Sequence, residues 1–407
     1  MDGKQGENMK ILYHHRTQRR AVEGVHIRGV IKGLEKLGHE IIEVAMVKDK
    51  REEEQTRKQD KNELLRLFAQ KAPNTLFRLA EIFQNLFSFS SIMTTMKDQH
   101  PDIVYERYAY FNFSGMLACK LKGIPMILEV NIVTDLQDTR NLALRSIARF
   151  IEKRLLGNAD AIFVVSSLLE QALVIRGVDG EKIYVQPNAV DIEEIHDIEP
   201  YILPETLNHK FKDKIIIGFL GGLQPWFKLE ELIKTFHRIN ANYPNTLLLM
   251  IGDGNLRSPL ESMSEEFGIK ENTHFFGQVS HEMALRLLKF MDIAVIPSTN
   301  MWCSPMKLFE YLGTGIPVVA PNIEAVNSII TDGVHGKLFS YNDFSDFEKA
   351  LEYLVINEKA RKKMGKAGKK HITKNYTWDI VAKKVADEAH SILVRTMFPE
   401  GPANRCT

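Results

Sequence analysis

The sequence has little of what secreted, metal-binding or membrane-spanning proteins depend on. Among 407 residues it has three cysteines, Cys119, Cys303 and Cys406, whose spacing matches neither a disulfide framework nor a metal site. No apolar run approaches the ~20 residues of a membrane span, and the first ten residues are polar. We therefore expect a cytoplasmic protein in a reducing compartment.

An excess of charge of either sign is also missing. The 53 Lys and Arg residues nearly balance the 52 Asp and Glu residues, for a net charge of +1, which argues against nucleic acid as a partner. The sequence has neither an Asp-x-Asp triplet nor a cluster of His and Cys residues. We therefore expect no bound metal and no cofactor.

The residues that are present predict an α/β fold. Hydrophobic residues make up 44% and charged residues 26% of the chain, as in globular proteins. Short apolar runs alternate with amphipathic segments of helical length, which is typical of parallel βαβ units. The chain is also longer than one hydrophobic core usually serves, so we expect two doubly wound parallel-sheet domains.

The alternating pattern lapses between residues 187 and 213, and a new strand begins at Ile215. We place a Rossmann-like acceptor-side domain at residues 1–195, with a helical insertion at about 48–98. A second Rossmann-like domain follows at 205–375. The tail, 376–407, is predicted to form a helix that crosses back to the N-terminal domain.

The insertion combines apolar and basic side chains between residues 64 and 96. Such a face could rest on an anionic membrane that bears a lipid-linked acceptor, at the inner side of that membrane. Packing onto the N-terminal core is the simpler interpretation. The apolar residues concerned are Leu64, Leu67, Phe68, Leu76, Phe77, Leu79, Phe83, Leu86 and Phe87.

Two glycines, Gly221 and Gly222, stand between a predicted strand at 215–220 and an amphipathic helix. A strand end of this kind suits an anion, because glycine lets a phosphate approach the backbone N–H groups and the helix start carries partial positive charge. Lys228 would add a full charge. A plain tight turn is the alternative interpretation.

A second helix start follows the strand at 293–297. Ser304 is the expected N-cap and Pro305 the expected first helical residue. Lys307 and Glu310 are three residues apart and share a face. A cation so near a helix start is misplaced unless an anion lies there, which indicates a phosphate, and Glu310 could accept hydrogen bonds from ribose hydroxyls. An exposed ion pair between the two residues is the alternative.

Residues 304–320 (SPMKLFEYLGTGIPVVA) resemble the donor-site helix of the retaining family 4 glycosyltransferases of GT-B fold, in which two Rossmann-like domains face each other across a cleft. Four other segments resemble motifs of that family in the same order. They are residues 187–191 (PNAVD), 218–223, 251–254 (IGDG) and 276–279 (FGQV).

The resemblance implies that Glu310 holds the nucleotide ribose and that Lys307 and Lys228 face the diphosphate. The donor site would further include Gly221, Gly222, Gly277, Gln278, Val279, Ser304, Pro305, Met306 and Leu308. The N-terminal half resembles the family more loosely, and its acceptor side would include Gly24, Val25, His26, Arg107, Glu129 and Asn131. Glu129 and Asn131 would contact substrate, although Glu129 could also be a buried carboxylate that supports the fold.

The implied activity is transfer of a hexose from a nucleoside-diphosphate sugar, with UDP or GDP as nucleotide, to a glycan or lipid-linked acceptor with retention. Cell-surface polysaccharide or glycoconjugate synthesis is the expected role. One departure concerns the donor sugar, because Trp302 stands where the family often has a first donor-helix glutamate.

Two other functions stay open. A sugar-nucleotide epimerase or hydrolase would need a carboxylate and histidine pair, and we identify no convincing pair for His14, His15 or His26. A non-catalytic nucleotide-sugar-binding subunit would need only the donor pocket.

Overall fold

The computed structural model describes residues 8–17, 22–45, 74–136 and 142–398. The chain divides into two compact units, the first formed by residues 1–186 and 378–407 and the second by 187–377. The division therefore falls before Pro187, earlier than the 195–205 expected from composition. Residues 187–191 belong to the second unit because Val190 pairs with Thr377 and Asn188 bonds to Ser304.

The first unit contains a six-stranded parallel sheet in the order β2-β1-β3-β4-β5-β6. The chain moves from β1 outward to β2 and then returns to β3 on the other side of β1, so the order reverses between β1 and β3. The strands are β1 Lys10–His15, β2 Glu40–Ala45, β3 Ile103–Arg107, β4 Met126–Val130, β5 Ala161–Val164 and β6 Ile183–Val185. The helices are α1 Val22–Lys36, α4 Asn74–Gln99, α5 Ser114–Lys122, α6 Arg145–Asn158, α7 Ser167–Ile175 and α17 Trp378–Met397.

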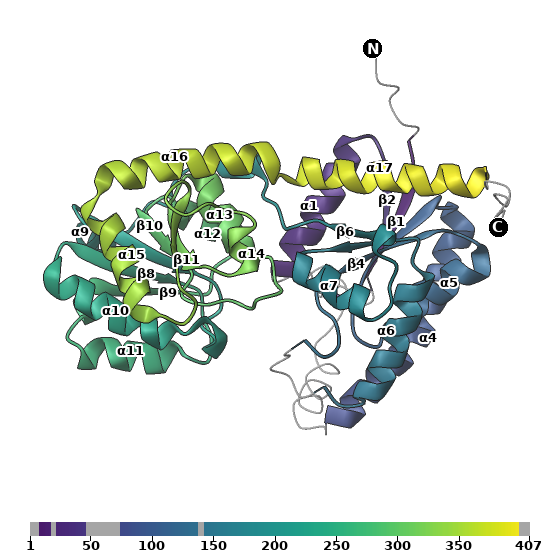
Figure 1. Ribbon diagram of the computed structural model, residues 1–407, viewed down its shortest axis with the longest axis horizontal. Coiled ribbons are helices and arrows are strands. Elements are labelled where there is room, and N and C mark those ends of the chain that lie inside the picture. The colour runs from purple at the N-terminus through teal and green to yellow at the C-terminus, as the bar shows by residue number, and fades with distance from the viewer. Residues whose placement is uncertain (1–7, 18–21, 46–73, 137–141, 399–407) are drawn as a thin grey trace, which may run out of the picture. The chain divides into compact units, whose positions relative to one another are not determined.

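The last helix, α17, packs along α1 in the first unit (Figure 1). Two glycines of α1 make this close approach possible, since a Cβ on Gly29 would lie 2.4 Å from the Trp378 ring and one on Gly33 2.6 Å from the Ala382 Cβ. The Trp378 ring also lies 4.9 Å from the His26 ring, centroid to centroid. The carboxyl-terminal helix thus completes the first unit and supports the start of α1.

The first half of helix α4 turns polar side chains inward, contrary to the expectation that its apolar residues pack on the core, whereas Ile92 and Met96 in its second half are buried as expected. Glu81, Asn85 and Ser88 are buried. The Asn85 amide donates to Phe111 O at 2.8 Å and accepts from the Phe113 N–H at 2.8 Å. The exposed side chains are Leu76, Phe77, Leu79, Phe83, Leu86 and Phe87, of which Phe87 is 79% exposed. The remaining apolar residues of the predicted insertion, 64–68, lie outside the described residues.

The second unit repeats the architecture with strand order β12-β11-β10-β7-β8-β9, again parallel. The order reverses between β7 and β10. The strands are β7 Ile215–Leu220, β8 Thr246–Ile251, β9 Thr273–Gly277, β10 Ile293–Val295, β11 Val318–Pro321 and β12 Gly336–Phe339. The helices are α8 Ile192–Asp197, α9 Glu205–Phe211, α10 Leu229–Asn242, α11 Arg257–Glu266, α12 His281–Leu288, α13 Met306–Thr314, α14 Glu324–Asn327, α15 Phe344–Ile356 and α16 Glu358–Asn375.

Helix α13 begins near the reversal point of this sheet and is buried along most of its length. Every residue from Met306 to Gly313 is buried. The Tyr311 hydroxyl accepts a hydrogen bond of 2.7 Å from the Leu220 N–H, which ties α13 to the end of β7. In open α/β sheets ligands bind beyond the carboxyl ends of the strands at such a reversal point. The α/β prediction is confirmed, and each unit has one such point.

Candidate functional site

The candidate donor site lies at the reversal point between β7 and β10. The loop after β7 carries Gly221 and Gly222, and the segment after β10 leads into α13. The ammonium group of Lys307, at the start of α13, connects the two. Its Nζ lies 4.1 Å from the ring centroid of Phe219 and 3.8 Å from that of Phe227.

The Lys307 ammonium group is buried, and none of the described carboxylates lies within ion-pairing distance of it. Among the described residues Nζ has no hydrogen-bond partner. Burial lowers the pKa of Lys307 to about 7, while Cys303 and Glu310 act weakly in the opposite direction. The aromatic faces offer a partial substitute for water, because a ring face attracts a cation. An anion bound beside Lys307 would therefore strongly stabilise the charged form of this buried ammonium group.

Gly221 contributes space rather than an amide. Its N–H donates to Ile251 O at 2.9 Å, so the expectation that this amide faces a phosphate is wrong. A Cβ at Gly221, whose φ is +138°, would lie 2.7 Å from Lys307 Nζ. Gly222 is exposed. The absence of a side chain at Gly221 is therefore what lets the lysine head reach the loop.

Lys228 does not join Lys307. Its ammonium donates to the Asn342 side chain and lies 5.7 Å from the Phe344 ring centroid. It lines an open hollow of about 450 Å³ together with Pro225, Phe344 and the acidic Glu230 and Glu231. The structure gives the two lysines different surroundings, with carboxylates beside Lys228.

The start of α13 differs by one residue from the prediction. Pro305 is the N-cap and Met306 the first helical residue, so Ser304 is not the cap. The Ser304 hydroxyl instead accepts from the Asn188 N–H at 2.9 Å, and the Asn188 amide donates to the Ser304 carbonyl. Met306 is buried, and Leu308 packs in the hydrophobic core, so the Leu308 side chain points away from any ligand.

Glu310 pairs with a histidine that the sequence analysis missed. His281, the first residue of α12, lies with Nε2 2.9 Å from Glu310 Oε1 and Nδ1 3.5 Å from Glu194 Oε1. Burial alone would lower the pKa of His281, but hydrogen bonds to Glu194 and Glu310 outweigh it and raise the pKa to about 9. Glu310 is buried and bonded to an imidazolium, so the expected alternative of an exposed pair with Lys307 is wrong.

Replacing His281 with glutamine is expected to lower the free energy of unfolding by about 2 kcal/mol near pH 6.5. The folded pKa is raised above the unfolded value of 6.5, so the stabilisation is complete below 6.5 and is lost as the pH rises through about 9. Urea unfolding of both proteins at several pH values between 6 and 10 measures the difference. A difference that stays constant over this range would contradict the assignment of an imidazolium.

The residues expected at the nucleotide base follow β9. Gly277 has φ +83°, and its carbonyl accepts from the Gly252 N–H at 2.9 Å. The Gln278 side chain is exposed and Val279 packs partly on the core. Gly277 therefore shapes the loop through its backbone, whereas Gln278 is available to a ligand.

In the first unit Glu129 collects the polar groups expected on the acceptor side. Oε2 accepts from Tyr105 at 3.0 Å and from Tyr13 at 3.3 Å, and lies 3.0 Å from His26 Nε2. Oε1 accepts from Arg107 and from the Asn131 amide. The structure thus brings His26, Arg107, Glu129 and Asn131 together, with Gly24 and Val25 in the first turns of α1.

This carboxylate is held ionised and fully bonded. Although burial raises the pKa of Glu129, Arg107 and His26 outweigh it, so the pKa lies well below its usual range. Four hydrogen-bond donors occupy a group that accepts about four hydrogen bonds, and His26 Nε2 lies 3.0 Å from it as well. Glu129 is therefore a buried, hydrogen-bonded carboxylate that supports the fold. Arg107 and Asn131 are the partly exposed members of the cluster.

Each of the three histidines considered for an epimerase or hydrolase has a carboxylate partner, contrary to the sequence analysis. His14 Nδ1 lies 3.1 Å from Glu106, and His15 Nε2 lies 2.7 Å from Glu43. The third histidine, His26, is the one that lies beside Glu129. His14 and Glu106 are completely buried. A pair without exposed atoms cannot take a proton from a substrate, so this one belongs to the interior.

The described residues contain neither a metal-binding cluster nor a membrane-spanning helix. Within the described ranges, no three His, Cys, Asp or Glu side chains are grouped so as to hold a metal ion. Of the helices in that part of the chain, none combines the length and apolar character of a membrane span.

Family models match most of the chain. The model for glycosyl transferases group 1 matches residues 207–371, which include the candidate donor-site residues, and the model for glycosyltransferase family 4 matches residues 24–194.

Curated relatives and solved structures agree with these matches. An uncharacterized glycosyltransferase of Methanocaldococcus jannaschii is 24% identical over 60% of this chain, which spans 61% of that relative. The UDP-Gal:alpha-D-GlcNAc-diphosphoundecaprenol alpha-1,3-galactosyltransferase of Escherichia coli is 24% identical over 68% of this chain and 72% of its own. The crystal structure of Anabaena Alr3699/HepE in complex with UDP has a TM-score of 0.68, with 94% of this chain and 100% of that chain covered at 14% identity, which shows a shared fold.

Proposed function

Because the chain belongs to the family 4 glycosyltransferases and has the GT-B fold, we propose that it transfers a hexose from a nucleoside-diphosphate sugar. The acceptor is a glycan or a lipid-linked sugar, the anomeric configuration is retained, and the product serves cell-surface polysaccharide or glycoconjugate synthesis. UDP is the first nucleotide to test, since the relative from E. coli is named for a UDP-sugar, and GDP is the second.

The observation that carries this proposal is the Lys307 ammonium group. It is buried against two aromatic rings beside Gly221, with Glu310 one helical turn further along α13. When the bond from the anomeric carbon to the diphosphate breaks, negative charge accumulates on the departing oxygens. A desolvated cation already in place stabilises that charge without reorganisation. One such donor lowers the activation free energy by about 3 kcal/mol.

The remaining residues orient the donor. His281 fixes the Glu310 carboxylate by a bond to Oε1, which leaves Oε2 to accept from ribose hydroxyls. Trp302 stands in place of the family's first donor-helix glutamate and leaves the sugar with a different contact. No enzymic nucleophile is assigned, because attack from the face of the departing diphosphate lets that group accept the acceptor's proton. The chemistry assigned to these residues requires no metal.

Turnover with a panel of nucleotide sugars tests the activity. Free nucleoside diphosphate that appears only when acceptor is added supports transfer. Release of nucleoside diphosphate without added acceptor would instead support the hydrolase or epimerase alternative. Binding without turnover would support a non-catalytic subunit.

Replacing Glu310 with glutamine is expected to weaken uridine and UDP binding alike by about ten-fold, because the amide is a poorer acceptor for ribose hydroxyls than a carboxylate. Glu194→Gln is the matched control, since Glu194 shares His281 with Glu310 and lies outside α13. Isothermal titration with uridine and UDP measures both variants. Equal losses in the two variants would assign the effect to His281 rather than to a ribose contact.

The exposed face of α4 supports a membrane-associated acceptor. Phe83, Leu86 and Phe87 are exposed, whereas Glu81 and Asn85 on the same helix are buried. Exposed apolar side chains of this size are characteristic of surfaces that bind a membrane or a protein. We place this helix at the inner face of the membrane, where it would meet a lipid-linked acceptor.

A further inference from the structure

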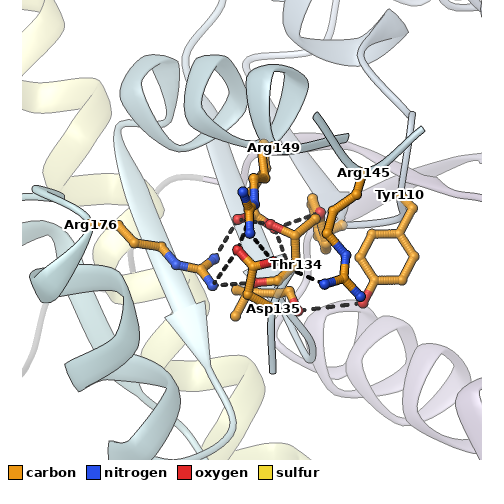
Figure 2. A network of polar contacts seen from close by, with 9 residues as sticks. Tyr110, Thr134, Asp135, Arg145, Arg149 and Arg176 are labelled. Carbon is orange, nitrogen blue, oxygen red and sulfur yellow. Dashed lines mark hydrogen bonds and ion pairs between the residues drawn. The ribbon is translucent and has the colours of Figure 1, made fainter. Parts of the chain in front are cut away.

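Three arginines of the first unit surround one carboxylate (Figure 2). Arg149 donates to Asp135 twice, from Nε to Oδ2 at 2.8 Å and from Nη2 to Oδ1 at 2.7 Å. Arg145 Nη1 and Arg176 Nη2 each lie 3.9 Å from an Asp135 oxygen. At that distance neither makes a hydrogen bond to Asp135. Asp135 thus lies close to three guanidinium groups and, of the three, forms hydrogen bonds with Arg149.

The nearest second carboxylate, Glu152, is occupied inside the unit. It accepts from the Thr134 N–H at 2.7 Å, from the Thr134 hydroxyl at 2.8 Å and from Tyr108 at 2.8 Å, and Arg176 also bonds to it. Among the residues that the structure describes here, three guanidinium groups face the two carboxylates of Asp135 and Glu152, an excess of one positive charge. That excess lies outward, because Glu152 is buried while the side chains of Arg145 and Arg149 are 50% and 55% exposed.

The helix that supplies two of these arginines presents cations to the surface. The exposed charged residues of α6 are Arg145, Arg149, Lys153 and Arg154, and its acidic residue is Glu152. Arg145 is the first helical residue, where the partial positive charge of the helix start makes a cation unfavourable. Both features favour a bound anion.

The cluster also lies where the fold places ligands. Thr134 and Asp135 follow strand β4, which ends beside Glu129, and the Tyr110 hydroxyl donates to the Val133 carbonyl at 3.4 Å (Figure 2). The carboxyl ends of parallel strands form the ligand-binding edge of an α/β sheet. Asp135 itself has φ +78°, a left-handed backbone conformation that a residue other than glycine adopts at some cost.

We propose that Arg145, Arg149 and Arg176 bind a phosphate or diphosphate group carried by the acceptor, an inference that rests on the proposed transferase function. Guanidinium groups bind phosphate oxygens through paired N–H donors, and three of them suit a dianion. In the absence of acceptor Asp135 keeps the three side chains assembled. The group can belong to a lipid diphosphate or to a water-soluble sugar phosphate, since both present the same oxygens.

Two probes distinguish these sources, both used with the full chain and saturating UDP so that the donor site is filled. One is N-acetylglucosamine 1-phosphate, compared with N-acetylglucosamine by titration. The other is a phosphatidylcholine vesicle with or without undecaprenyl diphosphate, compared by co-sedimentation. Vesicles lacking the diphosphate report adsorption through apolar surface alone. Phosphate-dependent binding to either probe supports the proposal and identifies the source, and binding to neither overturns it.

The double variant Arg145→Gln/Arg149→Gln is expected to bind the probe at least about ten-fold more weakly than the wild-type chain. Loss of one hydrogen bond to a charged group already lowers the affinity about ten-fold. Arg154→Gln is the matched control, because Arg154 is exposed on the same helix and lies over the Phe150 ring instead. Equal affinity in the double variant and the control would overturn the assignment.

Asp135→Asn gives the opposite expectation. Removing the competing carboxylate should tighten phosphate binding several-fold, whereas a purely structural ion cluster predicts lower stability with no gain in affinity. This variant keeps the test decisive if the double variant folds poorly. UDP titration of the same proteins separates the two proposals: UDP binding without phosphate binding rejects only the arginine site, and a wild-type chain that does not bind UDP rejects the proposed function.

Discussion

Replacing Lys307 with methionine is expected to stabilise the ligand-free protein while weakening UDP binding about 100-fold. The gain arises because methionine fills the same space between Phe219 and Phe227 without a desolvated charge, and such replacements stabilise by about 1 to 4 kcal/mol. The loss arises because the diphosphate would have no buried cation to bind, at a cost of about 3 kcal/mol. Uridine, which lacks phosphates, should bind to both proteins equally.

The pH dependence of this effect has a definite sign. The folded pKa of Lys307 is lowered from 10.5 to about 7, so the unfolded chain binds more protons between these values. The contribution of Lys307 therefore makes the protein more stable as the pH rises from 7 to 10.5, and the advantage of methionine shrinks over the same interval. His281 contributes the opposite slope between 6.5 and 9, which makes comparison with each variant necessary.

Calorimetry in buffers of different ionisation enthalpy measures the linked proton. Above pH 7 UDP binding to the wild-type chain should take up a proton at Lys307, and the methionine variant should lose that uptake. Lys234→Met is the control, because Lys234 is exposed and paired with Glu231. Unchanged UDP affinity in the Lys307 variant would remove the observation on which the proposed function depends.

Replacing Glu129 with glutamine is expected to lower the stability of the first unit by about 3 to 5 kcal/mol, as for other buried ion pairs that lose one partner. Arg107 would keep its charge without the Glu129 carboxylate, and a glutamine N–H₂ group would face donors. UDP affinity should be unchanged, since the residues proposed to hold UDP belong to the second unit. A catalytic role alone predicts the reverse, with activity lost and stability kept.

The acid dependence supplies an independent check. The folded pKa of Glu129 is lowered below the ordinary glutamate value of 4.5, so its stabilisation is present above that value and is lost as the pH falls below it. The variant should therefore show a weaker loss of stability in acid than the wild-type chain. Thermal unfolding from pH 7 down to pH 3 measures this, with Glu35→Gln, an exposed site on α1, as the control.

The regular elements were largely predictable, because each is specified by a local period. Strand β7 occurs at the predicted residues 215–220, and strand β10 begins at Ile293 as predicted. Strand β12 was missed, since its sequence GKLF is four residues long and has too few apolar positions to show a pattern. The inward polar face of α4 was missed for a different reason. Its buried side chains bond to residues of other elements, and no periodicity reveals that.

The candidate site was predictable where it lies on one helix. Lys307 and Glu310 share a helix, so their joint position follows from their spacing. His281 comes from another helix and precedes Glu310 by 29 residues, and the only local sign of it was a histidine at a helix start after Ser280. The arginine cluster likewise joins α6 with the end of α7 and the segment after β4.

The sequence by itself determined the α/β class, the two parallel-sheet units and the helix on which Lys307 and Glu310 lie together, because these depend on local patterns along the chain. Only the tertiary structure decided which charges are satisfied. Burial and long-range pairing assign Glu129 to the interior and bond Glu310 to an imidazolium. They also leave the Lys307 ammonium group without a counter-ion in the part of the chain that the structure describes. The energy of a charge depends on what surrounds it in space, and those surroundings come from distant parts of the chain.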